Sequence, residues 1–254
     1  MRIIVAPTAI EMGRWVASRA AADLRAALAS RQEARLVVAT GASQFEVLKH
    51  LVREPEIDWS RVDGFHLDEY VGLSNRHDAS FCRYLKERFV DHVPIRSFHY
   101  LNGDRDPQET LRIAGEAVAA VTVDVALIGI GENGHLAFND PPADFATTAP
   151  YLLVELDTAC RQQQVGEGWF PSLDDVPTHA ISMSVQQILQ CRRIYCSVPD
   201  ERKSLAVRRT LMEPIGPECP ATKLREHSAV DLVLDRAAAS QIPDEILGRA
   251  EILE

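Results

Sequence analysis

Short apolar segments alternate with helical segments along most of the chain, and no other feature of the sequence restricts the fold as strongly. The most apolar segment, residues 123–130, lacks alternation, as a strand buried on both faces does. This order predicts an α/β fold with one doubly wound, mostly parallel sheet and helices on both of its faces, a Rossmann-like arrangement. We expect residues 1–254 to form a single domain. The candidate strands are residues 2–6, 36–39, 62–67, 97–101, 123–130, 151–156, 180–184, 193–198 and 230–234, and the candidate helices are residues 8–30, 44–52, 79–90, 108–121 and 201–211.

The charge balance excludes two kinds of partner. Lys and Arg number 27 against 37 Asp and Glu, which gives a formal net charge of −10. So acidic a chain lacks the basic surface that nucleic acids and anionic membranes require, and we expect neither as a partner. No apolar run is long enough for a transmembrane helix, and the N-terminal segment does not have the pattern of a secretory signal.

The cysteines indicate a reducing compartment. Their number is odd and they contain no C-x-x-C pair, which fits free thiols better than a disulfide framework or a zinc site. We therefore expect a cytoplasmic protein without a structural metal. The five cysteines are Cys82, Cys160, Cys191, Cys196 and Cys219.

Three unusual segments directly follow candidate strands. They are residues 40–43 (TGAS), 68–70 (DEY) and 129–135 (GIGENGH). Ligands of open α/β sheets bind outside the carboxyl ends of the strands, so we expect these segments to meet at one edge of the sheet.

Residues 129–134 satisfy the pattern G-x-G-x-x-G of dinucleotide-binding loops. We reject that function because the pattern comes late in the chain and is soon followed by Pro141 and Pro142, so it does not open a helix. A glycine-rich turn would let the backbone approach the sheet edge, but it does not explain the polar residues His135, Asn139 and Asp140 behind it. A histidine just past a strand, with a carboxylate five residues on, suits an acid–base pair.

Asp68 and Glu69 are adjacent, so their side chains point to opposite faces if the strand continues, and only one of them faces the crevice. A solvated acidic loop is the alternative. Their place beside the apolar Phe65 and Leu67 favours partial burial, which raises the pKa of a carboxyl group and makes it a more effective base at neutral pH.

Two further positions suit an anion. Ser43 is a candidate N-cap for the helix at 44–52, and the backbone N–H groups before that helix are suited to a phosphate. Simple capping explains Ser43 equally well. Lys203 lies near the start of the helix at 201–211, where a solvated lysine is the alternative, and a phosphate role is attractive only if Ser43 lies opposite.

Residues 65–73 (FHLDEYVGL) and 129–141 (GIGENGHLAFNDP) together resemble the glucosamine-6-phosphate deaminase (isomerase) family. That family shares its fold with 6-phosphogluconolactonases and with sugar-binding transcription regulators. The first string is typical of the deaminases, whereas G-x-G-x-x-G-H is shared with the lactonases. The resemblance extends from near the N-terminus to the strand at 230–234 and identifies the chain as a divergent member.

The resemblance implies a reaction in which glucosamine 6-phosphate and water give fructose 6-phosphate and ammonia, with no metal or organic cofactor. Asp68 would move a proton between C2 and C1 of the opened sugar, and His135 would open the ring by shuttling a proton at the ring oxygen. Asn133 would assist ring opening, and Asp140, which replaces the usual Glu, would orient His135. Because Asp140 is one methylene shorter, its hydrogen bond to His135 is expected to be lost or bridged by water.

The resemblance also assigns the phosphate site to Gly41, Ala42, Ser43 and Lys203. Glu167 stands where the family has a phosphate-binding arginine, and its charge is unfavourable there. Arg161 is the replacement if the loop has a different register. The segment 160–170 is not typical of the deaminases.

Two other functions stay open. A lactonase would use His135 as the general base for water and would not need Asp68. A sugar-phosphate sensor without catalysis is the third possibility, although regulators of that kind carry an N-terminal helix-turn-helix, whereas Met1 here leads directly into a strand. In each case the partner is a small sugar phosphate, and a homo-oligomer is possible.

Overall fold

The computed structural model describes all of residues 1–254. Its strands are β1 (Arg2–Ala6), β2 (Ala34–Val38), β3 (Val62–His66), β4 (Asp68–Tyr70), β5 (Ser97–His99), β6 (Val125–Ile128), β7 (Tyr151–Glu155), β8 (His179–Met183), β9 (Arg193–Val198), β10 (Val230–Asp235) and β11 (Glu251–Ile252). Its α-helices are α1 (Ala9–Arg31), α2 (Phe45–Leu51), α3 (Phe81–Arg88), α4 (Pro107–Ala119), α5 (Thr158–Gly166), α6 (Val185–Leu189), α7 (Ser204–Met212) and α8 (Asp244–Leu247).

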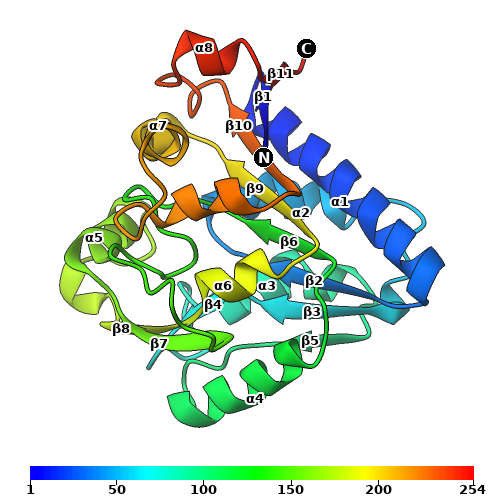
Figure 1. The fold of residues 1–254 in the computed structure, drawn as a ribbon. Coiled ribbons are helices and arrows are strands. Elements are labelled where there is room, and N and C mark those ends of the chain that lie inside the picture. The colour runs from blue at the N-terminus through cyan, green and yellow to red at the C-terminus, as the bar shows by residue number, and fades with distance from the viewer.

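Eight strands form the main sheet in the order β11-β1-β10-β9-β6-β2-β3-β5, and every neighbouring pair is parallel (Figure 1). Side chains alternate between two apolar layers, as in β1, where Ile4 and Ala6 pack with α1 while Val5 packs on the opposite face. Helices α1 to α3 contribute to the first layer, and α4, α6 and α7 to the second. The predicted doubly wound α/β fold is confirmed. None of the helices is both long and apolar enough to cross a membrane.

The strand order reverses between β2 and β6, which are neighbours in the sheet. From β2 the chain proceeds outward through β3 and β5, and from β6 it proceeds the other way through β9 and β10. Such a reversal leaves a crevice at the carboxyl ends of the two strands, where open α/β sheets bind ligands. Two of the three segments singled out in the sequence, residues 40–43 and 129–135, follow these two strands.

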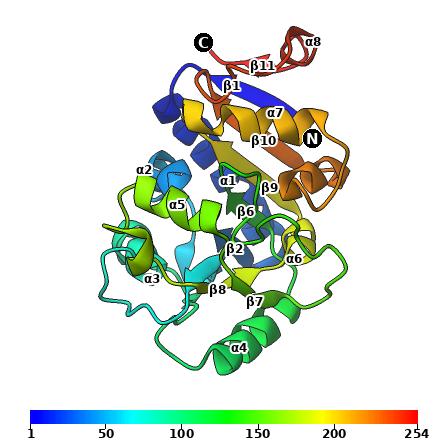
Figure 2. The ribbon, with the colours of Figure 1, turned by 90° about the vertical axis from the view of Figure 1, so that its left-hand side faces the viewer.

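A second sheet corrects part of the sequence prediction. The segments at 151–156 and 180–184 are predicted as further members of the parallel sheet, but β7 and β8 instead form an antiparallel sheet with β4. The chain leaves the main sheet at Leu67, whose N–H donates to the carbonyl of Val38 in β2 and whose carbonyl accepts from the N–H of Met183 in β8. Helices α5, α6 and α8 were not among the predicted elements either. In Figure 2, α5, β7 and β8 lie in front of the main sheet.

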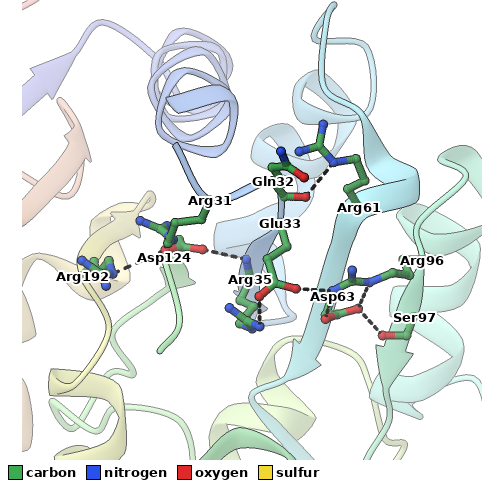
Figure 3. A network of polar contacts seen from close by, with 10 residues as sticks. All are labelled: Arg31, Gln32, Glu33, Arg35, Arg61, Asp63, Arg96, Ser97, Asp124 and Arg192. Carbon is green, nitrogen blue, oxygen red and sulfur yellow. Dashed lines mark hydrogen bonds and ion pairs between the residues drawn. The ribbon is translucent and has the colours of Figure 1, made fainter. Parts of the chain in front are cut away.

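The amino ends of the strands are closed by a network of ion pairs (Figure 3). Asp63 of β3 accepts from Arg96 and, at 2.6 Å, from the Ser97 hydroxyl of β5. Asp124, directly before β6, is buried and accepts from the Arg35 backbone N–H of β2 at 2.9 Å. These contacts join β3 to β5 and β2 to β6 at the edge of the sheet opposite the crevice.

Gly13 permits the close approach of α1 and α2. A Cβ atom at this position would lie 2.5 Å from Cβ and 2.6 Å from the backbone carbon of Glu46. We expect Gly13→Ala to lower the free energy of unfolding by about 1–3 kcal/mol, because the two helices have to separate.

Gly115 in α4 is the matched control, since a Cβ there meets nothing within 4 Å. Gly115→Ala should leave stability unchanged or raise it by up to about 1 kcal/mol through helix propensity. Urea unfolding of both variants measures the difference, and equal stabilities would contradict the close packing of α1 on α2.

Candidate active site

A cleft opens at the carboxyl ends of β2, β6 and β9. Six of the nine predicted site residues line it, and they come from four separate segments of the chain. The predicted convergence at one edge of the sheet is therefore present in the structure. The six are Gly41, Ala42, Ser43, Asp68, His135 and Lys203.

His135 and Asp140 form a buried pair. The imidazole Nδ1 lies 2.8 Å from Asp140 Oδ1, so the hydrogen bond is direct, and the expectation that the shorter side chain loses it or needs a water is wrong. Asn133 holds both partners: its amide donates to Asp140 Oδ1 at 3.0 Å, and its Oδ1 accepts from the backbone N–H of His135 at 3.0 Å. Burial alone would raise the pKa of Asp140, but the hydrogen bond and charge of His135 outweigh it, and the pKa lies below its usual value.

The glycine-rich turn positions the His135 ring. A Cβ atom on Gly131 would lie 2.1 Å from Nε2 of His135, so only glycine leaves room for the imidazole. A Cβ on Gly129 would lie 2.7 Å from the Ser43 hydroxyl, across the crevice. No helix begins after this turn, as the sequence predicts. The glycines therefore allow close approach of side chains, and the prediction that the motif does not open a dinucleotide-binding helix is confirmed.

Asp68 is a buried carboxylic acid in the same cleft as His135 and Ser43. Its side chain lines the cleft, and Oδ1 has no hydrogen-bond partner. Burial, with a smaller contribution from the charge of Glu69, raises the pKa of Asp68 to about 8. The predicted effect of apolar neighbours such as Leu67 on this carboxyl group is confirmed in its direction.

Glu69 points the other way, as the alternation of a strand requires. Its carboxylate accepts from the backbone N–H groups of Phe81 at 3.2 Å and Cys82 at 2.7 Å, and from the Ser80 hydroxyl at 3.0 Å. These donors belong to the first turn of α3, so Glu69 ties β4 to that helix. Of the adjacent carboxyl groups, Asp68 therefore faces the cleft and Glu69 holds the scaffold.

The turn after β2 differs from the predicted N-cap. Gly41 adopts φ +84°, and residues Ala42–Gln44 form a short 3-10 helix before α2 begins. The Ser43 hydroxyl does not cap a helix; it accepts from the Gln44 side chain at 3.1 Å and faces Gly129. Simple capping is thus excluded as the role of Ser43.

Lys203 ends the 3-10 helix Glu201–Lys203 and reaches into the cleft. Its Nζ lies 3.2 Å from Glu167 Oε1 and 3.7 Å from Glu132 Oε1. Glu167, the residue whose charge the sequence marks as unfavourable for phosphate, lines the same cleft.

Arg161 lies outside the cleft, which corrects its prediction as a phosphate ligand. Its guanidinium donates to the carbonyls of Leu173 at 2.6 Å and Val176 at 3.0 Å. These bonds hold α5 against the loop that follows it. Arg161 thus bonds to neighbouring backbone and is absent from the cleft lining.

The sequence prediction missed the contribution of α5, which supplies Gln163 and Gln164 to the cleft, with Trp169 just beyond it. Gln164 accepts from the Tyr70 hydroxyl at 2.7 Å, which links α5 to β4. One signal for this helix was available: Asp157 is its N-cap and accepts from the backbone N–H of Cys160.

One group of side chains has the composition of a metal site. Donor atoms of His135, Asp140 and Cys160 lie within 4.8 Å of one another. The closest pair, Nδ1 of His135 and Oδ1 of Asp140, is joined by a hydrogen bond, so a proton stands where a shared metal would bind. The arrangement therefore suits proton transfer better than metal ligation.

Comparison with known proteins agrees with this geometry. A glucosamine-6-phosphate deaminase of Exiguobacterium sp. is 35% identical over 252 residues, which cover 99% of this chain and 96% of the relative. A deaminase of the same name from Bacillus cereus is 34% identical over 212 residues, covering 83% of this chain and 79% of the relative.

The chain also resembles solved structures, one of a deaminase and others that share the fold alone. A monomeric glucosamine-6-phosphate deaminase is 31% identical and superimposes with a TM-score of 0.86, covering 94% of this chain and 99% of its own. A 6-phosphogluconolactonase from Shewanella baltica, 22% identical with a TM-score of 0.76, covers 92% of this chain and 97% of its own and shares the fold.

The family model described as glucosamine-6-phosphate isomerases/6-phosphogluconolactonase matches residues 7–233, which include every element that lines the cleft. With this match and the identity to relatives over nearly the whole chain, the protein belongs to the glucosamine-6-phosphate isomerase/6-phosphogluconolactonase family.

Proposed function

We propose that this protein deaminates glucosamine 6-phosphate, giving fructose 6-phosphate and ammonia. The observation that carries the proposal is a buried carboxyl group, Asp68, in the same cleft as the His135–Asp140 pair. An aldose–ketose isomerisation needs two acid–base groups, one for the ring oxygen and one for carbon. The relatives named above, which are deaminases of this sugar phosphate, support the assignment.

Ring opening falls to His135. Asp140 accepts from Nδ1–H, which fixes the tautomer and leaves Nε2 beside Gly131 in the cleft. Nε2 takes the proton of the O1 hydroxyl and returns it to the ring oxygen as the C1–O5 bond breaks. The open-chain aldehyde then exposes an acidic hydrogen on C2.

Proton transfer at carbon falls to Asp68. Its carboxylate removes the C2 proton, one proton of the ammonium group moves to O1 to give the enolamine, and Asp68 returns its proton to C1. The ammonium group on C2 of the substrate brings an opposite charge close to the carboxyl group, which favours the ionised base in spite of its burial. The product is a ketimine at C2; water adds to that carbon, and ammonia leaves as the ketone forms.

The phosphate group is assigned to the turn Gly41, Ala42 and Ser43 together with Lys203, all of which line the cleft. We further propose that residues 1–254 act as one domain on a small sugar phosphate, without a metal or organic cofactor. The five cysteines are unpaired, which supports a cytoplasmic location. A homo-oligomer stays a prediction from the sequence.

A lactonase function is the second candidate, because His135 could activate water for attack on a lactone. Solved lactonase structures with this fold, such as those from Shewanella baltica and Thermotoga maritima, are 22% and 15% identical, so the likeness extends to the fold alone. Hydrolysis of a lactone also gives no role to a buried carboxyl group with a raised pKa.

A paired assay tests the proposal. Purified protein is expected to release ammonia and fructose 6-phosphate from glucosamine 6-phosphate, and Asp68→Asn should lower kcat by about 10²–10⁴-fold because the base is lost. Stabilisation of the variant by fructose 6-phosphate in a thermal unfolding assay shows that the cleft still binds. Hydrolysis of 6-phosphogluconolactone by both proteins, with no ammonia release, would favour the lactonase.

Asp140→Asn should lower kcat by about 10²-fold or more, because an amide does not keep Nδ1–H of His135 in place. Asp140→Glu, which restores a carboxylate one methylene longer, should retain more activity than the amide. Nitrogen chemical shifts of the His135 ring report the tautomer independently of turnover. Equal kcat for Asp140→Asn and the wild type would remove Asp140 from the mechanism.

The raised pKa of Asp68 also predicts how stability depends on pH. The folded protein holds this proton up to about pH 8, whereas the unfolded chain releases it near the ordinary value of 3.8. Between these values the native state binds more protons than the unfolded state, so this group's contribution to stability falls as pH rises. The Tm of Asp68→Asn minus that of the wild type should therefore increase from about pH 4 to about pH 8. A constant difference would show that Asp68 is not protonated in the fold.

A further inference from the structure

Glu167 places a fixed carboxylate inside the cleft. Its side chain is only 10% exposed and is held by three donors, two from its own segment and one, Lys203, from a distant part of the chain. Nε2 of Gln163 donates to Oε1 at 2.8 Å, Nε1 of Trp169 donates to Oε2 at 3.3 Å, and Nζ of Lys203 lies 3.2 Å from Oε1. A carboxylate with this many partners is a built feature of the site.

The cations of the cleft are all paired. Lys203, 11% exposed, is engaged by Glu167 and approached by Glu132. The other cation of the lining, Arg202, donates to Asp200 at 2.8 and 3.1 Å. An incoming anion therefore meets no positive side chain that is free of a carboxylate.

A phosphate group bound at Lys203 has to share its ammonium with Glu167 and to lie close to a like charge. Both effects oppose binding, and they are strong because neither side chain is solvated enough to screen them. Glu132 exerts a weaker effect, since its side chain is 38% exposed and stands 3.7 Å from Nζ.

We propose that Glu167 is a specificity-determining residue that weakens the hold of the cleft on the phosphate group of its substrate. The inference rests on the proposed function, because it takes the phosphate to bind at Lys203. The phosphate lies away from the reacting carbons C1 and C2, so its interactions are the same in the ground state and the transition state. Glu167 consequently sets KM and the release of product, and leaves kcat unchanged.

The test compares Glu167→Gln with Glu132→Gln. Both remove one negative charge near Lys203, but only Glu167 lines the cleft. Glu167→Gln should lower KM for glucosamine 6-phosphate by at least about tenfold with kcat within about twofold, and Glu132→Gln should change KM by less than about threefold. For glucosamine, which has no phosphate, Glu167→Gln should leave kcat/KM unchanged.

Inorganic phosphate tests the same point without turnover. Its dissociation constant, measured by calorimetry on the free proteins, should fall by at least about tenfold in Glu167→Gln. Glu167→Ala, which also removes the hydrogen bonds to Gln163 and Trp169, should lower the dissociation constant for phosphate too. It replaces the amide variant in this test if Glu167→Gln folds poorly.

Equal phosphate affinity in the wild type, Glu167→Gln and Glu167→Ala would overturn the inference. So would a fall in kcat with KM unchanged, because it would assign Glu167 to the chemistry. Failure of the proposed function looks different: no protein would release ammonia, while the affinity for phosphate would still distinguish the Glu167 variants from the wild type.

Discussion

The burial of one carboxyl group, Asp68, is the constraint on which the site depends. The chain leaves the main sheet at Leu67 and enters the antiparallel sheet at β4, so Asp68 sits at the junction of two sheets, where little water reaches it. Glu69, one residue on, is equally buried but accepts from several N–H groups of α3. The two adjacent carboxyl groups therefore have different roles. Asp68 keeps an oxygen without a hydrogen-bond partner and is available for proton transfer, whereas Glu69 holds β4 rigidly against α3.

The two ends of the strands in the main sheet also have different roles, one in holding the scaffold together and the other in forming the site. Ion pairs around Asp63 and Asp124 bind the amino ends of β2, β3, β5 and β6 together, whereas the carboxyl ends carry glycine turns and partly satisfied polar groups. An unpaired buried carboxylic acid costs stability, and the apolar layers on both faces of the sheet offset that cost. The site tolerates an unpaired buried carboxyl group because the carboxyl groups of the surrounding scaffold, Asp63 and Asp124, are paired.

The local sequence pattern predicted most of the parallel strands, because a strand buried on both faces is a continuous run of apolar residues, as in residues 123–130. It failed for β7 and β8, whose strand character was right but whose partners lie far away in sequence and are chosen by packing. Asp68, His135 and Lys203 were found because they follow strands that end at one edge. Arg161 was misplaced, and the role of Gln163 and Trp169 was missed, because the path of the segment after Asp157 is decided by contacts with Leu173–Asp175, Lys203 and β4 that no local pattern encodes.

The cleft holds three carboxyl groups, those of Asp68, Glu167 and Asp200, although its proposed substrate carries a phosphate. Asp68 resists this by holding its proton until a cationic amino group arrives, so its charge develops where it is needed. Three donors keep the Glu167 carboxylate in place beside Lys203. Recognition then shifts from the phosphate toward the amino end of the sugar, where an ammonium is attracted by the same field that repels the phosphate. Such a field favours a substrate that carries an ammonium group over the same sugar phosphate without one.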